Sequence, residues 1–221
     1  MNKKRLWLLG GLLATGLVAT VLVNSPLTKI HGDATPTTAQ LSVPKQVKTN
    51  TQTAAVDQVF GTASNAKVTY QTAGQSATTA TYQQKTTATQ SKAAKQVATQ
   101  DHSGETVKLT DGTTAKEQGV MGHVYVTWQK GNWSVTAVTD TTQLLHTEPT
   151  TLASQVNTQL KQNDITTQSV AKGAVTVYST TQATPANQIS WQDQQNKKQV
   201  ATVTGQQAGT VYQIAKSAVA D

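Results

Sequence analysis

HVYVTWQKGNWSVTAV, residues 123–138, contains two runs of β-branched and aromatic residues separated by a Gly-Asn pair. This pattern around a two-residue turn predicts an antiparallel β-hairpin. In the expected register Trp128 and Trp133 flank the turn and form a cross-strand aromatic pair. The hairpin is the clearest structural signal in the chain, and the rest of the fold is predicted outward from it.

The tryptophans allow two interpretations. They could form an exposed aromatic platform for sugars or lipid, with Trp191 as a further member. Alternatively, the hairpin pair packs into a core, as most tryptophans do. We favour the core for the hairpin pair and retain Trp128, Trp133 and Trp191 as the candidate surface-binding residues.

Regular elements are expected on both sides of the hairpin. Residues 106–110 alternate and end at the turn pair Asp111-Gly112, which predicts a strand. Pro149 suits the first turn of a helix that Thr147 or Thr150 caps and that ends near residue 163. Three strands and a terminal helix should follow, at 173–178, 188–191, 199–204 and 208–219. The order and the short links predict an α+β domain with an antiparallel sheet covered on one side by helices.

Residues 55–105 give weaker signals. Residues 56–60 and 68–70 alternate like short strands, whereas 77–89 fit either a strand or disorder. Residues 91–98 have a helical composition with Ser91 as the expected N-cap.

The N-terminus has the pattern of an exported protein. Lys3, Lys4 and Arg5 precede an apolar run at residues 6–23, which is long enough, at about 1.5 Å per residue, to cross a bilayer core. We favour a retained signal-anchor at 1–23 over a cleaved signal peptide, because no small-x-small site closely follows the run. The three cations then stay cytoplasmic, and the rest of the chain is extracellular, or secreted if the leader is cleaved.

Residues 24–54 are rich in Thr, Gln and Pro and show little apolar periodicity. They are expected to form a flexible linker, because they cannot bury enough apolar surface to offset the entropy of ordering the chain. The extracellular α+β domain is then expected to span residues 55–221.

Composition excludes several classes of function. The chain has no cysteine, which excludes a lipoprotein signal, disulfides and thiol catalysis. Only 13% of the residues are charged, and Arg5 is the only arginine, so no nucleic-acid partner is expected. Scattered lysines remain compatible with weak attraction to anionic wall polymers or lipid headgroups.

The leader, the Thr/Gln-rich body, the hairpin at 125–135 and the ending at 189–191 and 211–218 resemble membrane-anchored extracellular proteins of lactobacilli and related Gram-positive bacteria. That family brings no established activity. The ending is also similar to that of curved-sheet carriers related to the lipoprotein chaperone fold. The resemblance covers the last 100 residues or so and implies no catalytic residues.

The sequence contains no catalytic, metal or cofactor motif. The histidines His31, His102, His123 and His146 lack zinc-binding spacing. Asp101-His102-Ser103 has the residue types of a serine triad without its context, and Glu105, Asp111 and Glu117 are interpreted as polar loop acids.

The leading hypothesis is a non-enzymatic, membrane-anchored protein that binds or scaffolds something at the cell surface. Its partners would be cell-wall polymers or another surface protein, besides the membrane itself. One alternative is a carrier or sensor of an apolar ligand, which predicts an internal cavity. The other is a cell-wall-active enzyme, which predicts acids or histidines converging in a groove.

Overall fold

The computed structural model describes residues 34–100, 103–143, 148–179 and 186–220. The chain divides into two compact units, Met1–Gly32 and Asp33–Asp221, and the second contains every described strand and helix. The predicted anchor at 1–23, with Lys3, Lys4 and Arg5, lies outside the described residues. Within the described ranges, the helices are too short or too polar to span a membrane.

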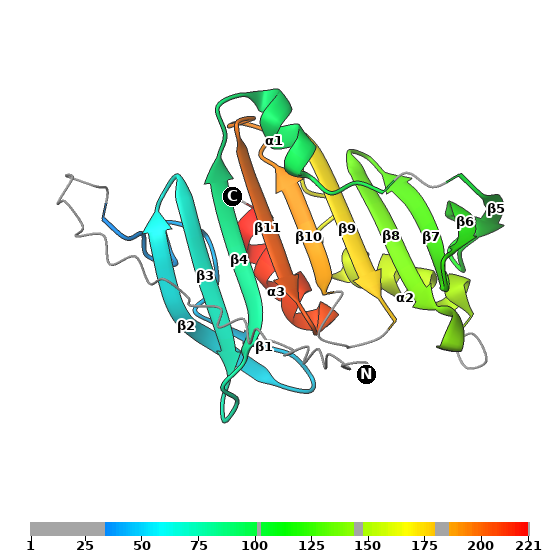
Figure 1. Cartoon of the computed structure of the whole chain (residues 1–221), viewed down its shortest axis with the longest axis horizontal. Coiled ribbons are helices and arrows are strands. Elements are labelled where there is room, and N and C mark those ends of the chain that lie inside the picture. Colours follow the sequence, from blue (N-terminus) through cyan, green and yellow to red (C-terminus); the bar gives the residue numbers. More distant parts are fainter. Residues whose placement is uncertain (1–33, 101–102, 144–147, 180–185, 221) are drawn as a thin grey trace, which may run out of the picture. The chain divides into compact units, whose positions relative to one another are not determined.

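The second unit is built on one sheet of eleven strands (Figure 1). In chain order these are β1 (Gln46–Lys48), β2 (Thr53–Thr62), β3 (Asn65–Thr72), β4 (Thr78–Thr86), β5 (Glu105–Lys108), β6 (Thr114–Val120), β7 (His123–Lys130), β8 (Trp133–Asp140), β9 (Lys172–Tyr178), β10 (Asn187–Gln192) and β11 (Gln199–Gly205). Their spatial order is β1-β2-β3-β4-β11-β10-β9-β8-β7-β6-β5.

The sheet is mixed, which corrects the prediction of a purely antiparallel one. Strands β8 and β9 pair in parallel, and the other neighbours pair antiparallel. The reason is helix α2 (Pro149–Gln162), which carries the chain back along the sheet before β9 begins. A strand that follows such a crossover runs parallel to the strand before it.

Helices pack on both faces of the sheet, whereas the sequence predicted that they would cover only one face. Helix α2 and helix α3 (Ala208–Val219) lie on one face, here called the α2/α3 face, where most of the buried apolar side chains form the core (Figure 1). Helix α1 (Gln90–Gln96) lies on the opposite face, the α1 face, and its Ala93 packs with Ala174 and Val200 in a small second cluster. Strand alternation accounts for this, because successive side chains point to opposite faces.

The predicted hairpin is confirmed as β7 and β8, which meet at a turn with Gly131 at φ +59°. The expected pairing of the two indoles is not observed. Trp128 lies opposite Val135, and Trp133 lies opposite Lys130, so the tryptophans are diagonal neighbours on one face.

The helix boundaries agree closely with the sequence, except at the caps. Helix α2 is preceded by Glu148 at its N-cap position and has Pro149 in its first turn. Helix α1 is capped by Thr89, not Ser91, because the Thr89 hydroxyl accepts a hydrogen bond from the Lys92 amide at 3.2 Å. Residues 78–86, which fitted either strand or disorder, form β4.

The described part of the predicted linker belongs to the folded unit. Leu41, Val43 and Val47 are 3–5% exposed and join the main core. These few apolar side chains are buried on the α2/α3 face. The sequence did not predict this, because their spacing shows no regular period. The folded unit therefore begins well before residue 55.

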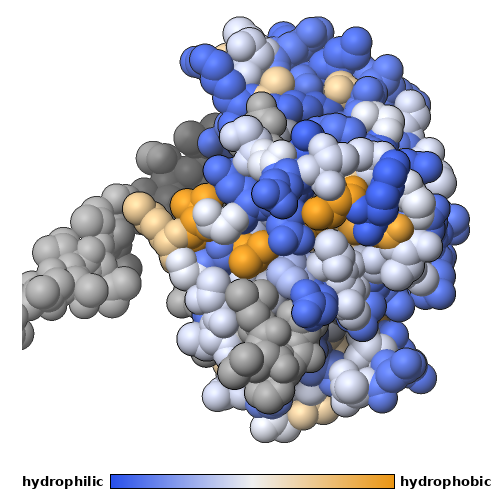
Figure 2. Space-filling view, turned by 90° about the vertical axis from the view of Figure 1, so that its right-hand side faces the viewer, coloured by the Kyte–Doolittle hydropathy of each residue, from blue (hydrophilic) through white to orange (hydrophobic). Residues whose placement is uncertain are grey.

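Strand β5 forms one edge of the sheet and is only four residues long. Figure 2 shows this side of the molecule, where a broken band of hydrophobic residues crosses a largely hydrophilic surface. At the β6–β7 turn Val120 is 37% and Met121 96% exposed. A short edge strand bearing the charged Glu105 and Lys108 disfavours the addition of another strand.

Candidate functional site

Two neighbouring hollows lie on the α2/α3 face where helix α3 ends. The first, of about 310 Å³, is lined by Gln168, Ser169, Val170, Trp191, Asp193, Gln194, Gln195, Val219 and Ala220. The second, of about 340 Å³, is lined by Gln40, Leu41, Ser42, Ala63, Tyr82, Gln84, Trp191, Asp193, Gln199, Ala201 and Ala218. Trp191 and Asp193 belong to both, so we call the pair the Trp191 hollows.

The position of Trp191 follows from the sheet register. Trp191 of β10 lies between Gly173 of β9 and Ala201 of β11, and Ala201 in turn lies beside Gln84 of β4. Both register neighbours of Trp191 are small residues, and its indole lines both hollows as the floor between them.

Tyr82 extends this floor across β4. Its ring centroid lies 6.5 Å from that of Trp191, with the planes tilted by 47°. The Tyr82 hydroxyl donates to Gln84 Oε1 at 2.6 Å, and Gln84 Nε2 donates to the Ala63 carbonyl at 2.7 Å. Burial raises the pKa of Tyr82 well above its ordinary range, with smaller contributions from Tyr70 and Asp193, so the hydroxyl stays neutral.

Asp193 shapes the rim that the hollows share. It follows β10 directly, and its Oδ1 accepts a hydrogen bond from the Gln195 amide at 2.7 Å and another from the Asn196 amide. A carboxylate that binds the amides two and three residues ahead stabilises a tight turn. This turn presents Gln194 and Gln195, both exposed, at the edge of the first hollow.

One wall of the second hollow comes from the N-terminal segment of the folded unit. Leu41 is buried in the core and holds Gln40 and Ser42 on either side of it at the hollow. The Gln40 side chain accepts a hydrogen bond from the Thr37 amide at 2.8 Å. The segment that leads from the predicted anchor is therefore part of the site.

The lining residues have a consistent chemistry. The walls combine amide and hydroxyl side chains, which can both donate and accept hydrogen bonds, with aliphatic ones such as Leu41, Val170 and Val219. The floor is aromatic, and Asp193 is the only acid among the lining residues. No group of three acids, histidines or cysteines that could hold a metal ion occurs in the described part of the chain.

The structure separates the three predicted tryptophans. Trp128, Trp133 and Trp191 are 3%, 1% and 4% exposed, so they do not form an exposed platform. All three belong to the main core, and Trp133 Nε1 donates to the Gln168 carbonyl at 3.2 Å. Trp191 alone lines a described hollow, from beneath, and it remains the one binding candidate of the three.

Those residues considered for catalysis that the structure describes do not converge on one site. His31, His102 and His146 lie outside the described residues. His123 lies on the α1 face, whereas Glu105 and Glu117 form a cross-strand pair on the α2/α3 face. Burial raises the pKa of Glu117, and the neighbouring Glu148 and Glu105 raise it further, but none of these acids lines the Trp191 hollows.

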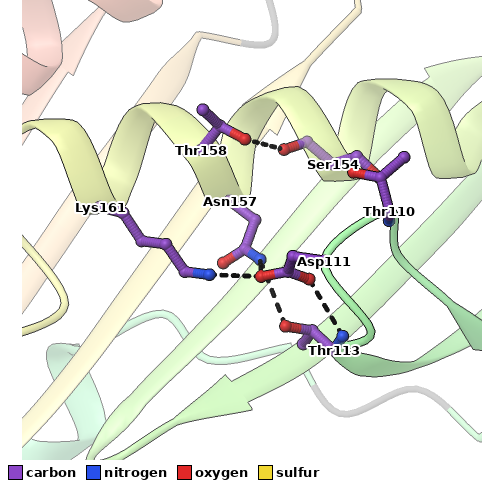
Figure 3. Close-up of polar contacts among 7 residues, drawn as sticks. All are labelled: Thr110, Asp111, Thr113, Ser154, Asn157, Thr158 and Lys161. Atoms are coloured by element: carbon purple, nitrogen blue, oxygen red, sulfur yellow. Dashed lines mark hydrogen bonds and ion pairs between the residues drawn. The ribbon is translucent and has the colours of Figure 1, made fainter.

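Asp111 has a structural role instead (Figure 3). It forms an ion pair with Lys161 of α2, accepts a hydrogen bond from Asn157 Nδ2 at 2.8 Å, and accepts another from the Thr113 amide at 3.0 Å. The hydrogen bonds and the Lys161 ammonium hold the pKa of Asp111 well below its usual range. The predicted Asp-Gly turn therefore fastens the β5–β6 hairpin to α2.

Sequence reasoning missed Tyr82, Gln84 and Asp193 as parts of the site. Nothing in their local sequence marks them, because they become neighbours only when β4 pairs with β11 and β11 with β10. Searches of protein-family models, curated proteins and solved structures found no match to this chain. The site is therefore interpreted from its own geometry.

Proposed function

We propose that the protein is a non-enzymatic, membrane-anchored extracytoplasmic module that binds an uncharged glycan of the cell surface in the Trp191 hollows. The observation that supports this most is the combination of neutral hydrogen-bonding walls with an aromatic floor in an open concavity.

A neutral sugar matches both parts of this lining. Its hydroxyls donate and accept hydrogen bonds, as do the glutamine amides and serine hydroxyls of the walls. Its apolar C–H groups can contact the part of the Trp191 indole that remains accessible in the floor, 4% of the residue. The volumes of about 310 and 340 Å³ suit one or two sugar units in each hollow.

The same lining argues against the two alternatives. A carrier of an apolar ligand would require apolar walls, whereas about half of the residues that wall these hollows carry amide or hydroxyl groups. A glycosidase requires two carboxylic acids at the bond to be cleaved, and Asp193 is the only acid in the lining. Binding without cleavage fits these residues best.

The extracytoplasmic location depends on the leader. Cations followed by an apolar run favour an anchor with a cytoplasmic N-terminus. Residues 24–33 link the predicted anchor to the described folded unit, which starts at residue 34.

Co-sedimentation of the unit Asp33–Asp221 with purified cell walls tests the proposal. This unit contains the described core, so it should fold without the leader. We expect binding to walls stripped of their anionic polymers, unchanged between low and high salt. Replacing Gln194 and Gln195 by alanine should weaken it several-fold, whereas Gln58→Ala on the other face should not. Binding that disappears at high salt would contradict a neutral ligand.

A further inference from the structure

A third hollow lies over β2, β3 and β4 and shares Gln84 with the second of the Trp191 hollows. These strands lie toward the edge of the sheet opposite β5 (Figure 1). It has a volume of about 410 Å³ and is lined by Phe60, Gly61, Asn65, Ala66, Lys67, Gln83, Gln84 and Lys85. Phe60, Lys67 and Gln83 lie side by side in one row of the ladder, and Asn65 lies beside Lys85 in the next. Alternation with the core residues Ala66 and Val68 places Lys67 on the α1 face.

Two cations and an exposed ring meet in this hollow. Lys67 and Lys85 are exposed and occupy diagonal positions on neighbouring strands, within reach of one ligand. Among the described residues, the ion pairs involve only Lys161 and Lys216. The acid nearest in the ladder, Asp57, accepts a hydrogen bond from the Thr69 hydroxyl at 3.4 Å.

Phe60 is 46% exposed, the only aromatic residue among the exposed large hydrophobic residues described. Its register partner is Lys67, so an apolar surface lies directly beside a cation. Asn65 and Gln83 add amide donors to the same hollow. A ligand that satisfies all of these groups carries negative charge, accepts hydrogen bonds and has a short carbon chain between its charges.

We propose that this hollow binds the phosphodiester groups of an anionic polyol-phosphate polymer. Lys67 and Lys85 would pair with phosphate oxygens, the two amides would donate to them, and Phe60 would cover the polyol carbons between successive phosphates. A concave site with a single exposed ring suits a chain better than a bilayer surface, which needs a broader apolar face. This hollow would bind an anionic ligand, whereas the ligand proposed for the Trp191 hollows is uncharged.

The test is titration calorimetry of the unit Asp33–Asp221 with poly(glycerol phosphate) at low and moderate salt. The double variant Lys67→Gln/Lys85→Gln should weaken binding about tenfold or more, since each lysine near an anionic surface contributes appreciably. The matched control, Lys92→Gln/Lys95→Gln on α1, removes the same charge elsewhere and should change affinity less than about threefold. Phe60→Ala should weaken binding without altering its salt dependence.

Several outcomes would overturn the proposal. Equal loss in the two double variants would mean diffuse electrostatics, and absence of binding would mean no site. Tighter, Lys67-dependent binding to phosphatidylglycerol vesicles than to the polymer would assign the hollow to the membrane. Thermal unfolding checks that the variants remain folded. Neutral-glycan binding by the Lys67→Gln/Lys85→Gln variant should be unchanged, so failure of this proposal is distinguishable from failure of the proposed function.

Discussion

The indole of Trp133 in β8 covers the backbone of Gly173, its register partner in β9. A Cβ atom added to Gly173 would lie 2.2 Å from Trp133 Cε3, far inside van der Waals contact. On its other side Gly173 is paired with Trp191. One glycine thus lies between two core tryptophans, and the second of them, Trp191, also forms the floor of the site.

Replacing Gly173 with alanine should therefore destabilise the unit by about 1–3 kcal/mol, because the added methyl must displace a rigid, buried ring. Urea unfolding measures the loss, and the fluorescence of the indoles should change in the folded state. Gly119→Ala in β6 is the matched control, since its Cβ would meet nothing within 4 Å. If both variants proved equally stable, the close contact at Gly173 would be wrong.

Leu41 provides a test of where the folded unit begins. It is 3% exposed in the core, so Leu41→Ala should cost about 2–4 kcal/mol in the free energy of unfolding. Lys45→Ala, at an exposed position nearby, should change stability by less than about 0.5 kcal/mol. A chain that starts at residue 45 should be less stable than one that starts at residue 33, and should also lose a wall of the second hollow. If the two chains were equally stable, residues 33–44 would not contribute to the fold, as expected for part of a flexible linker.

The Asp111–Lys161 pair predicts a pH effect. The folded-state pKa of Asp111 is lowered, so its contribution is present above the ordinary value near 3.8 and is lost as pH falls toward the lower folded value. Both side chains are partly exposed, so Asp111→Asn should cost no more than about 1 kcal/mol at pH 7. The difference in the free energy of unfolding between Asp111→Asn and the unmodified protein, measured by urea unfolding, should become smaller as the pH falls below about 4. Asp164→Asn removes the acid of the longer and more exposed pair with Lys216 and should change the free energy of unfolding less. If the loss of stability caused by Asp111→Asn became larger as the pH falls, this account would be contradicted.

Local patterns predicted the local structure well. The turn at Gly131, the alternation around it, and Pro149 in the first turn of α2 are contained in short stretches of sequence. The parallel pairing of β8 with β9 could not be predicted in this way. It depends on α2 packing back against the sheet, which is a property of the whole unit and not of any one window of residues.

The site was harder to predict for the same reason. Trp128 and Trp191 both belong to the core, and nothing in the local sequence indicates that Trp191 also forms the floor of a hollow. Trp191 acquires its register neighbours Gly173 and Ala201 only when three strands pair. Likewise, Leu41 belongs to the core only because β1 begins just after it and returns the chain to the sheet.

The central claim is that a neutral glycan occupies the Trp191 hollows, and indole resonances in a ¹⁵N-labelled sample of Asp33–Asp221 test it most directly. This unit contains three tryptophans, Trp128, Trp133 and Trp191. The indole resonance that is missing from the spectrum of the Trp191→Phe variant belongs to Trp191. Titration with a soluble, uncharged oligosaccharide from cell-wall glycan should shift the Trp191 resonance in a saturable manner, at low and high salt, and leave the two core resonances in place. No shift at Trp191 under saturating glycan, or a shift produced only by an apolar ligand, would contradict the account.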